Sequence, residues 1–256
     1  MTKKRLTAVI LAGGRGTRLG ELTEETPKPL ITVNDKQLLS YGVGFAHALG
    51  ASRIIISASY MTEKLDEARK KFKIETVLVT DRIFQPGKRI LGILAARDLV
   101  EGDLVIFDAD YIFHKDIADA VRRGTYADMT VHAADSKSPW MAQDVIARFT
   151  DQYRLIDMIK TEGTQKNLSA NELYFNSLLY CPAHVLEDFF SAAECAAAIE
   201  GPGGQHLEDA VLVFNRNKPV RVRNLGTPLW VEIDTPTELD AAHRFVATYA
   251  DFIPYA

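Results

Sequence analysis

Short apolar runs alternate with amphipathic segments of helical length along the first half of the chain, and this alternation limits the fold more than any other feature. Four runs have the length and apolar character of buried strands: 6–11, 53–59, 74–80 and 103–107. Helical patterns lie between or after them at 37–49, 62–72 (with Thr62 placed to cap it), 88–100 and 116–123. Strands joined through helices make right-handed crossovers, so the pattern predicts a mostly parallel sheet.

The pattern changes after about residue 127. Shorter runs joined by turns predict strands at 129–134, 144–149, 153–159, 173–181 and 220–222, with helices at 182–199 and 206–214. Thr235-Pro236-Thr237-Glu238 has the spacing of a capping box, which predicts the start of a last helix. We therefore expect one α/β domain over residues 1–256, with a small mixed β insertion.

Composition and charge exclude several classes of protein. The net charge of −4 over 256 residues does not indicate a nucleic-acid or membrane-surface partner. No apolar stretch approaches the roughly 18 residues that a membrane helix needs, and the run 6–12 is too short for a secretory signal. Cys181 and Cys195 lack the spacing of a metal site. A cytoplasmic protein without a membrane or nucleic-acid partner is expected, and a homo-oligomer is compatible with the sequence.

A glycine-rich loop follows the first strand directly, reading Leu11-Ala12-Gly13-Gly14-Arg15-Gly16-Thr17-Arg18-Leu19. Its glycines let the backbone approach a ligand and point amide groups at phosphate oxygens, to which Arg15 and Arg18 can add charge. Lys28 stands between two prolines, which fixes the backbone around it. A tight turn alone does not explain these cations. The loop has leucine where a dinucleotide fingerprint needs its last glycine, and it lacks the glycine-lysine pair of a P-loop.

Acidic residues occur in two further places. Asp108 and Asp110 follow the fourth strand, and Glu232 and Asp234 lie two apart in an extended segment, where they can face the same side. Carboxylates suit a hard cation such as Mg²⁺. The alternatives are solvated turn aspartates for the first pair and a helix N-terminal acid for Asp234.

The loop 11–19 followed by Pro27-Lys28-Pro29-Leu30 resembles the signature of the sugar-phosphate nucleotidyltransferase superfamily. The resemblance implies a Rossmann-like fold of the glycosyltransferase-A type. Trp230-Val231-Glu232-Ile233-Asp234 is similar to the tail of the phosphocholine-type cytidylyltransferase branch, where an acidic pair contributes metal ligands. The motifs stand near the start, middle and end of the chain, whereas residues 129–223 match only loosely.

This resemblance implies that two parts of the chain bind different substrates. Residues 1–127 would form the nucleotide-binding core, and 128–256 the acceptor-binding part with the C-terminal metal motif. The nucleotide would contact Leu11, Ala12, Gly13, Gly14, Arg15, Gly16, Thr17, Gln85 and Asp108. Arg18 and Lys28 would be catalytic contacts to phosphates, and Mg²⁺ would be held by Asp110, Glu232 and Asp234. The expected reaction transfers CMP from CTP to a small phosphorylated or phosphonylated acceptor and releases pyrophosphate.

Base and acceptor are less constrained by the sequence. Gln85-Pro86 resembles the pair that reads the base in sugar-1-phosphate nucleotidyltransferases, which use other triphosphates and are the alternative. Lys88 and Arg89 stand where the cytidylyltransferase branch often has asparagine; they could bind an acidic acceptor or begin a solvated helix. Trp140, Tyr174 and Trp230 could cage a quaternary ammonium or belong to the core.

Two further expectations concern histidines and activity. His206 and His243 lie in helical patterns and are expected to be structural or exposed. A silent nucleotide-binding regulator is a third hypothesis, against which the complete acidic motifs argue.

Overall fold

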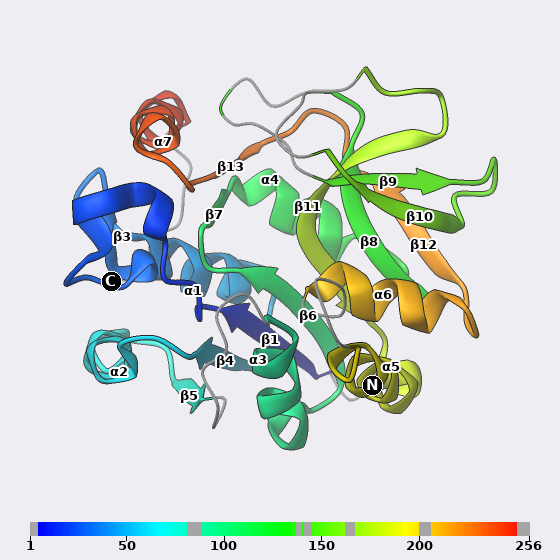
Figure 1. Ribbon diagram of the computed structural model, residues 1–256, viewed down its shortest axis with the longest axis horizontal. Helices are drawn as coiled ribbons and strands as arrows, with labels where there is room; N and C mark the ends of the chain where they lie inside the picture. Colours follow the sequence, from blue (N-terminus) through cyan, green and yellow to red (C-terminus); the bar gives the residue numbers. More distant parts are fainter. Residues whose placement is uncertain are drawn as a thin grey trace.

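A large mixed sheet carries helices on both faces (Figure 1). The computed structural model describes residues 5–80, 89–136, 140, 145–161, 167–199 and 206–249. Within these ranges nine strands join the sheet, in the order β10-β9-β11-β6-β1-β4-β5, with β8 beside β11 and β12 beside β8. No helix among the described residues has both the length and the apolar character needed to cross a membrane.

The first half of the chain builds the parallel part of the sheet, as predicted. Its strands are β1 (Leu6–Leu11), β4 (Arg53–Ala58), β5 (Thr76–Thr80) and β6 (Asp103–Asp108). All three pairings among them are parallel. At the carboxyl end of β1, Leu11 lies opposite Ser57 of β4 and Asp108 of β6. The loops that follow these strands therefore meet at one edge of the sheet, where ligands bind in folds of this type.

The later strands extend the same sheet and make it mixed. They are β8 (Met129–Ala134), β9 (Val145–Phe149), β10 (Leu155–Lys160), β11 (Glu172–Cys181) and β12 (Val220–Asn224). Strand β11 runs antiparallel to β6 and so attaches this group to the parallel part. Figure 1 shows β9, β10 and β12 together at the end of the sheet opposite β5. The predicted mixed β portion is thus continuous with the central sheet.

Successive side chains of the strands point to opposite faces of the sheet and pack into two hydrophobic cores. On β1, Ala8 and Ile10 face one core, and Val9 and Leu11 face the other. The first core takes residues from α1 (Leu38–Ala48), α2 (Thr62–Arg69), α4 (Lys115–Arg122) and α7 (Pro236–Thr248). The second takes residues from α3 (Arg89–Ala96), α5 (Leu186–Ala197) and α6 (Leu207–Asn215). Burial of both strand faces explains why the sequence shows continuous apolar runs.

Several small elements were not foreseen. Thr62 does not cap α2; Met61 takes the cap position with φ 46°. Strands β7 (Tyr111–Phe113) and β13 (Trp230–Glu232) pair as an antiparallel ribbon. Strands β2 (Thr32–Val33) and β3 (Lys36–Gln37) pair as an antiparallel hairpin. Short 3-10 helices span Thr17–Thr23 and Lys28–Leu30. The β7–β13 ribbon matters most, because it brings the end of the chain to the loop after β6.

Candidate active site

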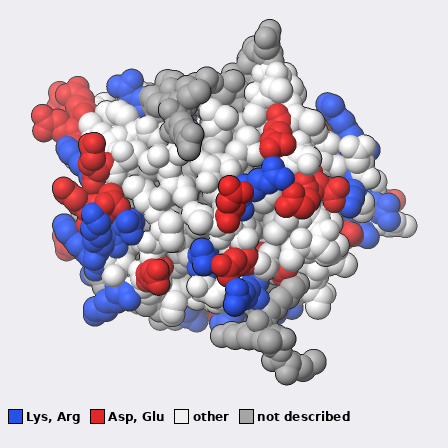
Figure 2. Space-filling view, turned by 90° about the horizontal axis from the view of Figure 1, so that it is seen from below, with Lys and Arg blue, Asp and Glu red and all other residues white. Residues whose placement is uncertain are grey.

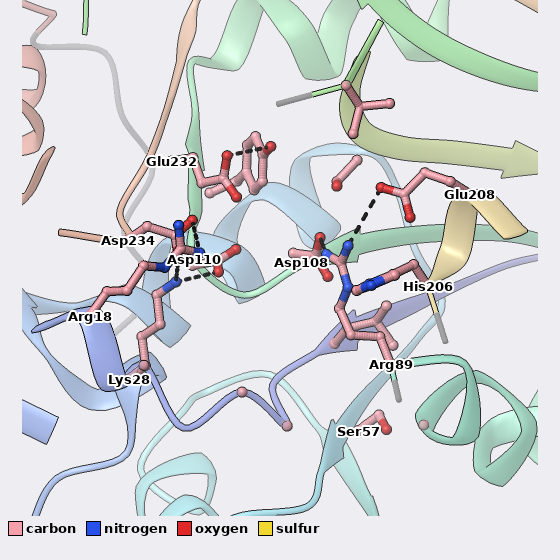
Figure 3. A pocket seen from close by; sticks show the side chains of 18 of the residues that line it. Arg18, Lys28, Ser57, Arg89, Asp108, Asp110, His206, Glu208, Glu232 and Asp234 are labelled. Carbon is pink, nitrogen blue, oxygen red and sulfur yellow. Dashed lines mark hydrogen bonds and ion pairs between the residues drawn. The ribbon is translucent and has the colours of Figure 1, made fainter. Parts of the chain in front are cut away.

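A pocket of about 660 Å³ opens at the carboxyl ends of β1, β4 and β6. It gathers residues from the start, middle and end of the chain (Figure 3). Of the positions singled out in the sequence, those lining it are Leu11, Gly13, Gly14, Gly16, Thr17, Arg18, Lys28, Arg89, Asp108, Asp110, His206, Glu232 and Asp234. The motifs separated by more than 200 residues therefore share one cavity.

The glycine loop forms one wall of the pocket. Gly16 has φ 68°, a conformation that glycine adopts without strain, and a Cβ on Gly13 would lie 2.7 Å from Ser59 Oγ. The amide of Ala12 donates to Ser57 O at 2.7 Å. That amide is therefore committed to the sheet, and Gly13 is the first loop residue whose amide is not committed to a strand pairing in the described structure.

Two of the expected nucleotide contacts do not line the pocket, and a third lies outside the described residues. Ala12 is buried, with 2% of its surface exposed. Arg15 is exposed, with its guanidinium 5.2 Å from the centre of the Tyr60 ring. Gln85 lies in the segment 81–88, outside the described residues, as does Lys88.

Lys28 lies at the centre of the charged cluster. Its Nζ donates to Asp110 Oδ2 and to Asp234 Oδ1, each at 2.6 Å, and its side chain is 6% exposed. The prolines beside it position this contact: Pro27 is extended, and the 3-10 helix begins at Lys28 itself. On the more exposed side, Arg18 pairs with Asp234 Oδ2 at 2.7 Å.

Three acidic residues form a set that could hold a cation. One carboxylate oxygen each from Asp110, Glu232 and Asp234 lies within 4.8 Å of the others. The β7–β13 ribbon sets Glu232 opposite Tyr111, whose hydroxyl donates to Glu232 Oε2 at 2.9 Å. Oδ1 of Asp110 is buried and has no hydrogen-bond partner among the described residues. An oxygen-only donor set with an unsatisfied carboxylate atom fits Mg²⁺.

The capping box of α7 fixes the backbone of Asp234. Glu238 Oε2 accepts from the backbone amides of Asp234 and Thr235, both at 2.9 Å, and the amide of Glu238 donates to Thr235 Oγ1. The predicted box is therefore present. It orients the acid that precedes it, so Asp234 faces the pocket although it also stands just before a helix.

Burial and neighbouring charges shift the pKa values of Lys28, Asp234 and Glu232 in different directions. Burial opposes the charge of Lys28, but Asp110 and Asp234 outweigh burial and raise the pKa of the ammonium. Burial would raise the pKa of Asp234, yet Lys28 and Arg18 lower it. Burial, together with Asp110 and Asp234, raises the pKa of Glu232 well above its usual value. Lys28 therefore stays charged at neutral pH.

A second polar region of the pocket was predicted only in part: Arg89 and Asp108 were candidates, but Glu208 and Ser177 were not singled out. Arg89 ion-pairs with Asp108, and its other terminal nitrogen lies 3.5 Å from Glu208 Oε1. Ser177, at a register shift of β11 with φ 55°, and His206 also line this side. Arg89 therefore lines the pocket rather than beginning a solvated helix. His206 lines it too and has a structural role at the N-cap of α6, where its backbone amide donates to Asp209 Oδ2 at 2.9 Å. Burial raises the pKa of Asp108 to about 6, partly offset by Arg89.

The aromatic side chains considered for a cage lie elsewhere. Trp230 is 0% exposed and Tyr174 is 1% exposed. Trp140 packs edge-on against Phe245 and Tyr249. None of the three lines the described pocket, and they belong to the core or its margin. On the face shown in Figure 2, basic and acidic side chains are interspersed.

Comparisons with known proteins identify relatives among the nucleotidyltransferases. The chain is 29% identical over 164 residues to a choline-phosphate cytidylyltransferase of Streptococcus pneumoniae, covering 64% of this chain and 68% of that relative. It is 32% identical over 110 residues to a 2-aminoethylphosphonate cytidylyltransferase of Lancefieldella rimae, covering 43% of this chain and 44%, less than half, of that relative. Its relatives include both cytidylyltransferases and sugar-phosphate nucleotidyltransferases.

Solved structures show the same fold. An inositol-1-phosphate CTP transferase from T. maritima superposes with a TM-score of 0.75 at 15% identity, covering 96% of this chain and 98% of that one. The strands and helices of the present chain therefore follow the fold of known nucleotidyltransferases, as the sequence predicts. Residues 7–138, more than half of the chain, match the model of the nucleotidyl transferase family. The chain therefore belongs to the nucleotidyl transferase family.

Proposed function

We propose that this chain is a Mg²⁺-dependent cytidylyltransferase that transfers CMP from CTP to a small phosphorylated or phosphonylated metabolite and releases pyrophosphate. One observation carries the proposal: Lys28 Nζ lies 2.6 Å from both Asp110 and Asp234, beside a glycine loop that can receive phosphates. This arrangement brings cations and candidate metal ligands to one point of a pocket large enough for a nucleotide. The relatives that transfer cytidylyl groups support CTP as the donor.

The reaction needs positioning and charge neutralisation rather than a protein nucleophile. An oxygen of the acceptor's phosphate forms a bond to the α-phosphorus, and the bond from that phosphorus to the bridging oxygen breaks. Pyrophosphate leaves with the electron pair. A phosphate acceptor with a second pKa near about 6 is already ionised at neutral pH, so we assign no general base.

The residues of the site have distinct parts in this proposal. Gly13, Gly14, Gly16 and Thr17 would wrap the triphosphate, while Leu11 and Asp108 would bound the nucleoside. Arg18 and Lys28 would offset charge that builds on the α-phosphate and the leaving group. Asp110, Glu232 and Asp234 would hold Mg²⁺, which supplies Lewis-acid stabilisation of phosphoryl oxygens when bound.

A sugar-1-phosphate nucleotidyltransferase that uses another triphosphate is the second candidate. Gln85-Pro86 in the sequence and the sugar-phosphate nucleotidyltransferases among its relatives favour it. A pyrophosphate-release assay separates the two: each nucleoside triphosphate is tested with phosphocholine, 2-aminoethylphosphonate, polyol phosphates and sugar 1-phosphates. Release that requires CTP and a non-sugar acceptor supports the first candidate. Release that requires another triphosphate and a sugar 1-phosphate supports the second, and binding without release from any pair would indicate a silent regulator.

A further inference from the structure

The pocket extends past the acidic set into a second polar region, which the proposed function leaves without a role. Glu208 and His206, at the start of α6, and Arg89, at the start of α3, meet there beside Asp108 (Figure 3). Ser177 of β11 also lines the pocket. Two of the elements, α6 and β11, come from the part of the chain expected to bind the acceptor. Figure 3 shows this group on the opposite side of the cavity from Lys28 and Arg18.

Glu208 has an unsatisfied oxygen in this region. The residue is 4% exposed, and its Oε2 has no hydrogen-bond partner among the described residues. Its other oxygen lies 3.5 Å from Arg89, whose guanidinium is committed more closely to Asp108. A buried carboxylate oxygen that lacks a donor is unfavourable, and a molecule that brings an N–H or O–H group would satisfy it.

Among the described residues, the surroundings of Glu208 do not suit a quaternary ammonium. Methylated nitrogen offers no donor to Oε2 and is recognised best by the faces of several aromatic rings. Trp140, Tyr174 and Trp230 lie outside the pocket. The described lining includes two aromatic side chains: Phe175, and Tyr111, whose hydroxyl is engaged by Glu232.

We propose that Glu208 Oε2 accepts a hydrogen bond from a hydroxyl or primary ammonium group at the end of the acceptor remote from its phosphate. The site then selects acceptors that carry such a donor over those that end in a trimethylammonium. This assignment rests on the proposed function for the identity of the pocket, but it concerns binding and can be tested without turnover.

The first test compares binding of three phosphate esters to the wild-type protein by calorimetry, with Mg²⁺ and a non-hydrolysable CTP analogue present. Phosphoethanolamine and phosphocholine differ by three methyl groups, and glycerol 3-phosphate offers hydroxyls instead. We expect phosphoethanolamine or glycerol 3-phosphate to bind at least about tenfold more tightly than phosphocholine. Equal or tighter binding of phosphocholine, or no binding of any of the three, overturns the assignment. Selective binding without pyrophosphate release from any triphosphate would retain it and refute the proposed function.

The second test assigns the selectivity to Glu208. In Glu208→Ala the ratio of affinities for the donor-bearing ester and phosphocholine should fall toward one, while affinity for the CTP analogue is unchanged. Glu208→Gln keeps the shape and one accepting oxygen, so it should retain part of the ratio even if the alanine variant is poorly folded. Glu63→Gln is the control, because Glu63 is an acid in the first turn of α2, outside the pocket. An unchanged ratio in both Glu208 variants, or an equal loss for all three esters, overturns the assignment.

Discussion

Lys28 occupies the space between two carboxylates that would hold the metal, so its removal should affect metal binding and turnover in opposite directions. In Lys28→Met, Asp110 and Asp234 lose a partner that lies 2.6 Å from each of them. The variant should bind free Mg²⁺ more tightly than the wild type when no nucleotide is present. It should also turn over far more slowly, because no ammonium then neutralises the phosphates.

The size of the effect follows from the charges. Two unit charges 4 Å apart interact by about 4 kcal/mol at an effective dielectric constant of about 20, and a divalent ion doubles the repulsion. That value is an upper bound, because Lys28 can swing away as the metal enters. We therefore expect at least about 1.4 kcal/mol, or a tenfold tighter dissociation constant. Without metal the variant should be less stable by about 3–5 kcal/mol, because the carboxylates are left uncompensated.

Titration calorimetry with Mg²⁺ alone measures the first quantity, and melting with and without Mg²⁺ measures the second. Lys218→Met is the matched control, since Lys218 makes one ion pair of 2.6 Å with Asp188 on the surface. Its metal affinity and its response to Mg²⁺ should equal those of the wild type. If Lys28→Met binds free Mg²⁺ no more tightly than the wild type, then Lys28 does not compete for the metal position and the reasoning fails.

Three further perturbations test other parts of the structure. Asp110→Asn should lower turnover at least about a hundredfold while the melting temperature stays close to that of the wild type; near-normal turnover would remove Asp110 from the mechanism, and exposed Asp116→Asn is the control. Glu238→Ala breaks the capping box and should lower the free energy of unfolding by about 1 kcal/mol in urea titrations, whereas an unchanged midpoint would show that the box is energetically silent. His132 is buried, and burial lowers its pKa from 6.5 to about 4, so only the unfolded state gains its proton between these values. Stability should fall by about 3 kcal/mol from this group as the pH drops from 6.5 to 4, and His132→Gln should flatten that part of the profile; parallel profiles would contradict the assignment.

Sequence patterns predicted the local elements because local physics decides them. Apolar runs such as Ile54–Ile56 are buried on both faces of the sheet, and the box at Thr235 and Glu238 forms from residues three apart. The glycine loop could also be predicted from the sequence. The left-handed φ at Gly16 and the close approach of Ser59 to Gly13 both favour a residue without a side chain. In each case the cause and its signal lie within a few residues.

The second polar region of the pocket could be predicted only through Arg89 and Asp108, and its assembly with Glu208 and Ser177 could not. Its members come from α3, β6, β11 and α6, and no motif joins Arg89 to Glu208 across 119 residues. Glu208 reads as an ordinary acid in the first turn of a helix, where such acids are common. A shift of register in β11 presents Ser177 to the pocket, and such a shift leaves no mark in the hydrophobic pattern. Only the packing of α6 against the sheet makes these side chains neighbours.

The acidic set shows how a distant motif becomes a site. Glu232 and Asp234 were recognisable as a pair, but their meeting with Asp110 depends on the ribbon in which Trp230 lies opposite Phe113. The amide of Ile233 donates to Asp110 O at 3.1 Å, so the backbone between the two acids is anchored to the third. The ribbon is held by the burial of Trp230 and Val231 in the first core. Hydrophobic packing of this short strand therefore sets the spacing of the carboxylates, and a substitution such as Val231→Ser should disturb metal binding without touching a charged residue.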